Sequence, residues 1–234
     1  MSKGWLSPWA IYNPTTGLFV WENDDATPKW SFPLRNGNVI LHGTTNDPYV
    51  KRCDSFTTIK AAGATAIRSA QDLSGATPIT FVLDAQPDVP RTLTWVLTHT
   101  QITAFSISFS GVDARGNSIG ETITQADGWS GETHNAFATI TSIILTARTG
   151  TGAGNTMNVG IGSKLGLSNN IVAITDVYKC SKVVVAGAAQ AADYSGAANI
   201  TPEATYDTVD VSAGTAIVNN DCYTIWYKSR FYAI

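Results

Sequence analysis

Three histidines, His42, His99 and His134, are the side chains of this sequence that most readily exchange protons near neutral pH. They are far apart along the chain, and none belongs to a His-Glu-x-x-His motif, so no zinc-binding helix is predicted. Serine and threonine are so abundant that their presence cannot indicate a catalytic triad without geometry. We therefore predict no catalytic residue, no cofactor and no bound metal, and we expect that the protein is not an enzyme.

Two polar segments have some features of ligand-binding loops. The glycine-rich residues 150–155 could cradle a phosphate, but such a loop opens a helix, and the residues that follow have the pattern of a strand. Asp113, Asn117 and Glu121 supply oxygen ligands around a turn, but Arg115 stands where a calcium-binding loop needs an oxygen ligand. We predict plain inter-strand turns at both places, with calcium at the second as the alternative.

Aromatic side chains are the strongest candidates for contacts with other molecules, because Trp and Tyr are enriched at the energetically dominant positions of protein interfaces. Four of the seven tryptophans lie within the first 50 residues, and a second aromatic cluster spans residues 223–232. The residues that we predict to make such contacts are Trp5, Trp9, Trp21, Trp30, Trp226 and Tyr227. Exposed aromatic rings also offer flat faces to sugars, so carbohydrate binding remains an alternative.

The composition narrows the class of protein that could carry these residues. Only 14% of the 234 residues are charged, against roughly 25% in typical soluble domains, which argues against a helical bundle or a coiled coil. The net charge of −3 and the isoelectric point near 5.5 argue against a nucleic-acid binder. A hydrophobic content of 44% is too high for a disordered chain.

Alternation of apolar and polar residues predicts β-strands from residue 79 onward. In residues 103–110, three apolar side chains (Phe105, Ile107 and Phe109) alternate with serines, a pattern that gathers the apolar groups on one face of a strand. The predicted strands are 79–83, 91–98, 103–110, 118–124, 137–146, 157–161, 172–180, 182–185, 205–211 and 223–227. Residues 58–72 are rich in alanine and are the one helix candidate, with two short strands as the alternative.

The first 50 residues differ from the rest because they hold five of the nine prolines, which break both long helices and central strands. An Asn-Gly turn at residues 36–37 predicts a short hairpin. The sequence therefore predicts an all-β protein: an extended, loop-rich arm over residues 1–50 and an antiparallel β-sandwich, jelly-roll or immunoglobulin-like, over residues 51–234. The arm either docks on a neighbouring subunit or covers one end of its own domain.

The three cysteines, Cys53, Cys180 and Cys222, are predicted to be packed thiols, with one disulfide and one free thiol as the alternative. No signal peptide and no apolar stretch long enough to span a bilayer is visible. We expect a protein that is made in a cytoplasm and has no membrane partner.

The order of motifs between residues 57 and 227 resembles a family of tailed-phage virion structural proteins. The central match is the strand, Gly-x-Asp-x-x-Gly-Asn turn and return strand of residues 105–122. The flanking matches are residues 66–73, 88–94, 137–143, 159–167 and 223–228. The tryptophan-rich first 50 residues fall outside the resemblance.

The resemblance implies a non-enzymatic component of the virion, assembled in the host cytoplasm, that acts as a decoration or cement protein of the phage head. Its expected partners are the major capsid protein, other virion subunits and copies of itself, with a trimer as the expected homo-oligomer, and not nucleic acid. Two alternatives remain open. One is a carbohydrate-binding or host-recognition module of a tail or fibre, and the other is a structural component of the neck or tail.

Overall fold

The computed structural model describes residues 10–13, 18–21, 29–34, 37–44, 47–126, 129–184, 192–213 and 215–230. Within these ranges the protein is all-β, its paired strands are antiparallel, and the helical structure consists of the 3-10 turn η1 (Ile174–Asp176). No described helix has the length and apolarity needed to cross a membrane. The predicted fold class, an antiparallel β-sandwich, is confirmed.

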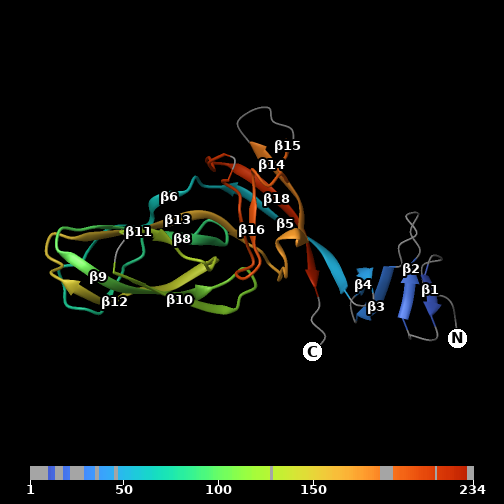
Figure 1. The fold of residues 1–234 in the computed structure, drawn as a ribbon, viewed down its shortest axis with the longest axis horizontal. Coiled ribbons are helices and arrows are strands. Elements are labelled where there is room, and N and C mark those ends of the chain that lie inside the picture. Colours follow the sequence, from blue (N-terminus) through green and yellow to red (C-terminus); the bar gives the residue numbers. More distant parts are fainter. Residues whose placement is uncertain are drawn as a thin grey trace.

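Two sheets pack face to face to form the sandwich (Figure 1). The first sheet has the order β10 (Ser118–Gln125), β9 (Ile102–Val112), β12 (Thr139–Gly150) and β7 (Ile79–Thr80). The second has the order β11 (Ser130–Glu132), β8 (Arg91–Thr98), β13 (Thr156–Gly166), β17 (Thr208–Asp210) and β16 (Thr201–Glu203), and β6 (Gly63–Asp72) also pairs with β13.

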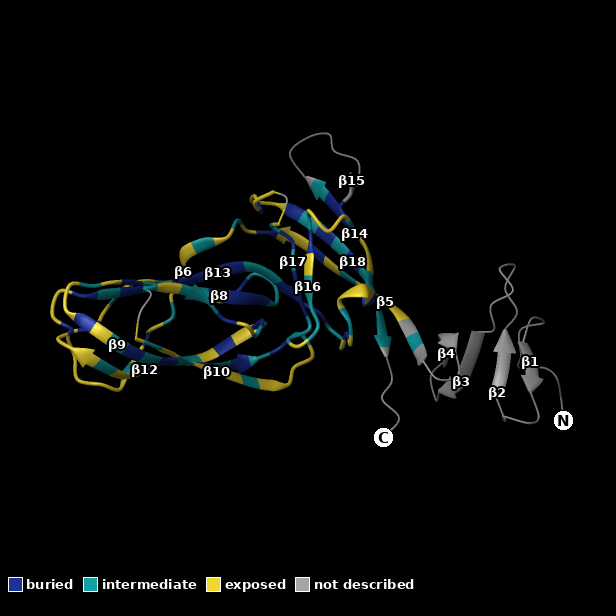
Figure 2. Cartoon of the chain, in the orientation of Figure 1, coloured by how far each residue is buried: buried dark blue, intermediate teal, exposed yellow. Residues whose placement is uncertain are grey.

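The sandwich core is built by the alternating residues that the sequence indicates. Phe105, Ile107 and Phe109 of β9 are buried, and the rings of Trp95 on β8 and Phe105 meet edge to face with their centroids 5.2 Å apart. Figure 2 shows buried residues along the facing strands of both sheets and exposed residues at the loops. Full burial of each large apolar side chain contributes about 1.5–3 kcal/mol, which makes this cluster the main stabilising element of the sandwich.

A third sheet runs from the N-terminal strands into the body of the protein. Its order is β1 (Ala10–Asn13), β2 (Leu18–Trp21), β3 (Lys29–Leu34), β4 (Gly37–Thr44), β5 (Asp47–Ile59), β18 (Asp221–Arg230), β14 (Val177–Val184) and β15 (Ala192–Asp193). The predicted Asn-Gly hairpin is present as β3 and β4, with Leu34 paired to Gly37. β5 runs without a break across residue 50, and β1–β4 extend away from the sandwich (Figure 1).

A second hydrophobic core lies beneath β5, β18 and β14, separate from that of the sandwich. Phe56, Tyr223, Ile225 and Tyr227 from this sheet pack there together with Val209 of β17. Residues of β13 and β17 thus connect the second core to the sheet that contains β8.

Arg115, in the turn between β9 and β10, links the sandwich to the second core. Its guanidinium lies 2.9 Å from a carboxylate oxygen of Asp113 and 3.0 Å from one of Asp207, and it also donates to Asn170. Asp207 accepts a hydrogen bond of 2.8 Å from the backbone N–H of Ile171. The resulting network joins a hairpin of the sandwich to two loops beside the second core.

Several expectations about secondary structure need correction. The helix proposed for residues 58–72 is wrong; these residues form the end of β5 and all of β6, as in the two-strand alternative. The strands predicted at 79–83 and 205–211 are reduced to the short strands β7 and β17, and the two strands predicted at 172–180 and 182–185 are joined in β14. The strand predicted at 172–180 begins only at Val177, because the Asp176 carboxylate accepts hydrogen bonds of 2.9 Å from the N–H groups of Val172 and Ala173 and folds this segment into η1.

The two buried tyrosines of the second core should make the protein sensitive to alkali. Burial raises the pKa of both Tyr223 and Tyr227 from 10.0 to about 12. A group whose pKa is raised in the folded state stabilises the fold below its unfolded pKa, and this stabilisation is lost as pH rises through the folded value. We expect the free energy of unfolding to fall between about pH 10 and about pH 12, by about 1.4 kcal/mol for each pKa unit of each tyrosine.

Urea denaturation across this pH range measures the effect. The Tyr223→Phe/Tyr227→Phe variant, which has no phenol to ionise at these positions, should show a shallower fall than the wild type. An equally steep fall in this variant would show that other groups cause the alkaline loss of stability.

Candidate interaction surfaces

The oxygen ligands predicted around the turn after β9 serve the turn itself. The Asp113 carboxylate accepts hydrogen bonds from the N–H groups of Arg115 (2.8 Å) and Asn117 (2.9 Å). Burial alone would raise the pKa of Asp113, but the hydrogen bonds from Asn117 and Arg115 outweigh it and lower this pKa. Glu121 points elsewhere and accepts from the N–H groups of His134 and Asn135. In the described residues, no three side chains of the metal-ligating types gather at one point.

The sequence also contains a Gly-x-Ser-x-Gly spacing, Gly116-Asn117-Ser118-Ile119-Gly120. This motif can place a nucleophilic serine on a strained turn between a strand and a helix. Here Ser118 is instead the first residue of β10 and pairs with Val112 across a hairpin. The glycine-rich residues 150–155 are likewise a connection between two strands, β12 and β13, and no helix follows them.

The described histidine side chains do not form a shared site. The ring of His99 lies against that of Trp129, tilted by 41°, with the centroids 3.6 Å apart. His134 stacks on Tyr206 at 4.7 Å, and its Nδ1 atom lies 3.8 Å from a carboxylate oxygen of Glu203. The backbone of His42 belongs to β4, and its side chain lies outside the described set.

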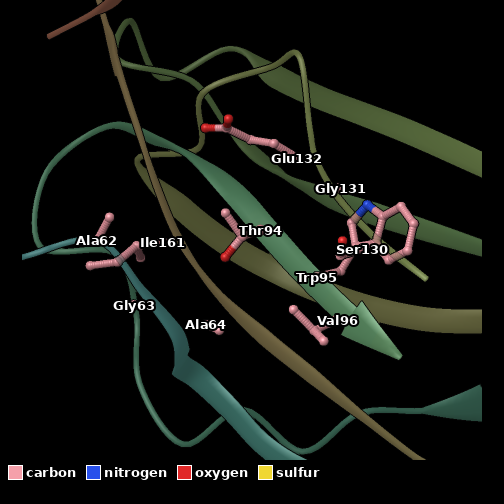
Figure 3. A pocket seen from close by; sticks show the side chains of 10 residues that line it. All are labelled: Ala62, Gly63, Ala64, Thr94, Trp95, Val96, Ser130, Gly131, Glu132 and Ile161. Carbon is pink, nitrogen blue, oxygen red and sulfur yellow. The ribbon is translucent and has the colours of Figure 1, made fainter. Parts of the chain in front are cut away.

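A shallow groove of about 480 Å³ opens on the sheet that contains β8 (Figure 3). Ala62, Gly63 and Ala64 line one part of it, and residues of β8, β11 and β13 line the rest. Glu132 contributes the one carboxylate among the lining residues, and this carboxylate accepts a hydrogen bond from the hydroxyl of Thr92. The groove therefore offers a tryptophan ring, aliphatic and small hydroxyl-bearing side chains and one acid to a ligand, without a base paired to a nucleophile among its lining residues.

The outer side of the sandwich sheet β10–β9–β12 forms a surface that we call the hydroxyl face. Its polar residues are Ser106, Ser108, Ser110, Thr122, Thr124 and Ser142, which the strand register places side by side, and Ile144, opposite Ser108, is an apolar member of the same face. The hydroxyl oxygens of Ser108 and Thr122 lie 2.8 Å apart, and those of Ser106 and Thr124 lie 3.0 Å apart. Such cross-strand pairs hold the side chains in place, so the hydroxyl face is ordered and carries no charge.

The hydroxyl face ends at an open sheet edge. β10 has eight residues and pairs only with β9 among the described strands. Of the other edge strands of the sandwich, β7, β11 and β16 have two or three residues, and β6, which has ten and pairs only with β13, contains Arg68. β10 also contains no Lys, Arg or Pro, the residues that commonly protect an edge from pairing with another chain. This edge is therefore the longest unprotected one on the described body of the sandwich.

The outer side of the third sheet is different in character, and we call it the lysine face. It consists of Tyr49, Lys51, Lys179, Trp226 and Lys228. The Lys179 Nζ atom lies 4.7 Å from the centroid of the Trp226 ring, and the Lys228 Nζ atom lies 4.9 Å from that of Tyr49. The sequence alone indicates Trp226 as a contact residue but not the group of lysines around it, because only the strand pairing brings Lys51, Lys179 and Lys228 together.

The structure separates the predicted contact residues. Trp226 is half-buried on the lysine face, whereas Tyr227 is buried in the second core and donates a hydrogen bond of 2.9 Å to Asp54. The backbones of Trp21 and Trp30 belong to β2 and β3, and their side chains lie outside the described set. Trp5 and Trp9 lie outside the described residues, so their predicted contacts remain predictions.

All three cysteines are free thiols, as predicted, but they are not all packed inside. Cys180 is buried in the second core, Cys222 is half-buried, and Cys53 is exposed beside Trp226.

No protein family, no curated protein and no solved structure matches this chain.

Proposed function

We propose that this protein is a structural subunit of a tailed-phage virion, a decoration or cement protein that stabilises the head by contacts between subunits. The motif order described above supports the family, and the hydroxyl face with its open edge at β10 carries the argument from the structure. The major capsid protein and copies of this chain are the proposed partners.

The hydroxyl face is suited to lasting contact with another protein surface. Burying a charge without a partner is costly, whereas hydroxyl groups that already hydrogen-bond to one another lose less when water is removed. The free edge of β10 adds unpaired backbone groups, to which a partner strand can hydrogen-bond. Repetition of such a contact over many symmetric positions raises its overall strength through avidity.

Carbohydrate binding through exposed aromatic rings has weaker support. The ring of Trp226 lies beneath the Lys179 ammonium group, and Tyr227 faces the second core. Neither therefore offers a free aromatic face to a sugar.

A charge placed on the hydroxyl face tests the proposed function. Thr122→Lys puts an ammonium group beside Ser108, where a partner would bury it without a counter-charge, so binding to undecorated heads of the encoding phage should weaken at least about tenfold. Co-sedimentation with purified heads measures the binding, and quantitative mass spectrometry of virions measures the copy number.

Thr175→Lys is the matched control, because Thr175 is exposed in η1, outside the hydroxyl face. It should bind heads like the wild type. If virions lack the protein, or if Thr122→Lys binds heads as well as Thr175→Lys does, the proposed function or its assignment to the hydroxyl face is wrong.

A further inference from the structure

The lysine face concentrates positive charge that the described part of the chain does not neutralise. Arg68, Arg91, Arg115, Lys164 and Lys182 have carboxylate partners. Lys51, Lys179 and Lys228 form no ion pair with any carboxylate whose side chain the structure describes, and they differ from the other unpaired cations, Arg52, Lys60 and Arg148, in that the strand pairing gathers them on one face. In a protein with a net charge of −3, this face therefore stands out as locally basic.

The strand register makes this arrangement unfavourable for the chain alone. Lys51 on β5 and Lys228 on β18 are directly opposite each other. Like charges at such cross-strand positions destabilise a sheet. The aromatic rings under Lys179 and Lys228 offset part of this repulsion through cation–π contacts, but they add no negative charge. An anionic group docked across the two lysines would remove the repulsion.

The sequence contains one dense acidic run that could supply such a group. Glu22, Asp24 and Asp25 place three carboxylates within four residues, between β2 and β3. The other acidic residues are more widely spaced along the chain. In the hydrogen-bonded order of the third sheet, β3 and β4 stand between β2 and β5, and β1–β4 extend away from the sandwich (Figure 1).

We propose that the lysine face of one subunit binds the acidic residues 22–25 of a second copy of this chain. The contact joins two different surfaces: repeated in one direction it is heterologous and generates a ring or an extended array of subunits, and exchanged reciprocally between two copies it closes a two-fold dimer. The inference rests on the proposed structural function, and it identifies one of its partners as the protein itself. It also gives the N-terminal strands a specific role as the donor of the acidic segment.

Charge reversal on each side tests this contact. Sedimentation velocity should show association of the wild type at about 0.01 M ionic strength and its loss at about 1 M, because the Debye length falls from about 30 Å to about 3 Å. Lys51→Glu/Lys228→Glu should raise the dissociation constant at least about tenfold, and so should Glu22→Lys/Asp24→Lys/Asp25→Lys. An equimolar mixture of these two variants should associate again, a result that misfolded variants would not give.

Arg52→Glu/Lys60→Glu is the control, since it makes the same change in net charge at exposed positions that do not belong to the lysine face. It should associate like the wild type. A wild type that stays monomeric at low salt overturns the inference, as does association that survives reversal of either surface. The head-binding test on Thr122→Lys is independent of this outcome, so failure of the self-contact and failure of the proposed function can be told apart.

Discussion

Replacing Arg91 with leucine is expected to lower the free energy of unfolding by about 3–5 kcal/mol, because it removes a fully buried charge from a hydrogen-bonded site. The guanidinium donates to the carbonyl oxygen of Gly162 through Nε (2.9 Å) and to that of Lys60 through Nη1 (2.8 Å). It also lies 3.3 Å from a carboxylate oxygen of Asp88. Leucine would leave these three acceptors buried or half-buried without this donor, and the connection between β5 and β6 would lose its attachment to β13.

Urea denaturation measures this loss, and Arg68→Leu provides the control. Arg68 also pairs with an aspartate, at 2.9 Å from Asp84, but both side chains are partly exposed, so its replacement should cost about 0–1 kcal/mol. Arg91→Lys keeps the positive charge and loses the planar fork, so it should fall between these two variants. If Arg91→Leu is no less stable than Arg68→Leu, the buried arginine does not anchor the connection between β5 and β6 to β13.

Most of the sandwich could be predicted from the sequence, because side-chain alternation is a local signal. The spacing of Phe105, Ile107 and Phe109 identifies β9 and its buried face, and the turn residues Asp113 and Asn117 identify the hairpin to β10. Each of these features depends on residues within a few positions of one another, so no knowledge of distant pairing is needed.

The alanine- and glycine-rich residues 58–72 show where local propensity fails. Their composition suggests a helix, but small residues here serve close packing between strands. A Cβ atom added to Gly160 of β13 would come within 1.8 Å of the carbonyl oxygen of Gly63 on β6. The short side chains therefore allow β6 to cross close to β13, which is a tertiary requirement that helix propensity does not record.

The candidate surfaces could be predicted only in part, because strand pairing between distant segments is not visible in local sequence patterns. The serines and threonines of the hydroxyl face are visible in the alternation of β9 and β10. By contrast, Lys51, Lys179 and Lys228 come from three strands that are far apart along the chain, and their shared face follows only from the pairing of β5 and β14 with β18. The burial of Arg91 was also hidden, because an arginine at the start of a strand is ordinarily exposed.

The second large effect is expected at the ion pair between Lys182 and Asp221. Their Nζ and Oδ2 atoms lie 3.0 Å apart, and Asp221 is fully buried. Asp221→Ala should lower the free energy of unfolding by about 3–5 kcal/mol, because it leaves the ammonium group of Lys182 without its counter-charge in the second core. Lys182→Met should cost a similar amount, since it leaves the carboxylate unpaired. Urea denaturation at neutral pH measures both losses.

The double variant Lys182→Met/Asp221→Ala distinguishes a coupled pair from two independent contacts. With both charges removed, it should be less destabilised than the sum of the single variants by about 2–3 kcal/mol.

Burial alone would lower the pKa of Lys182, but its hydrogen bonds with Tyr223 and Asp221 outweigh it and raise this pKa. In Asp221→Ala the interaction with Asp221 is lost, so the pKa of Lys182 falls and the lysine releases its proton more readily. The difference in free energy of unfolding between this variant and the wild type should therefore shrink as pH rises from about 7 toward about 10. Additive losses that stay constant over this pH range would show that the pair does not act as a buried ion pair.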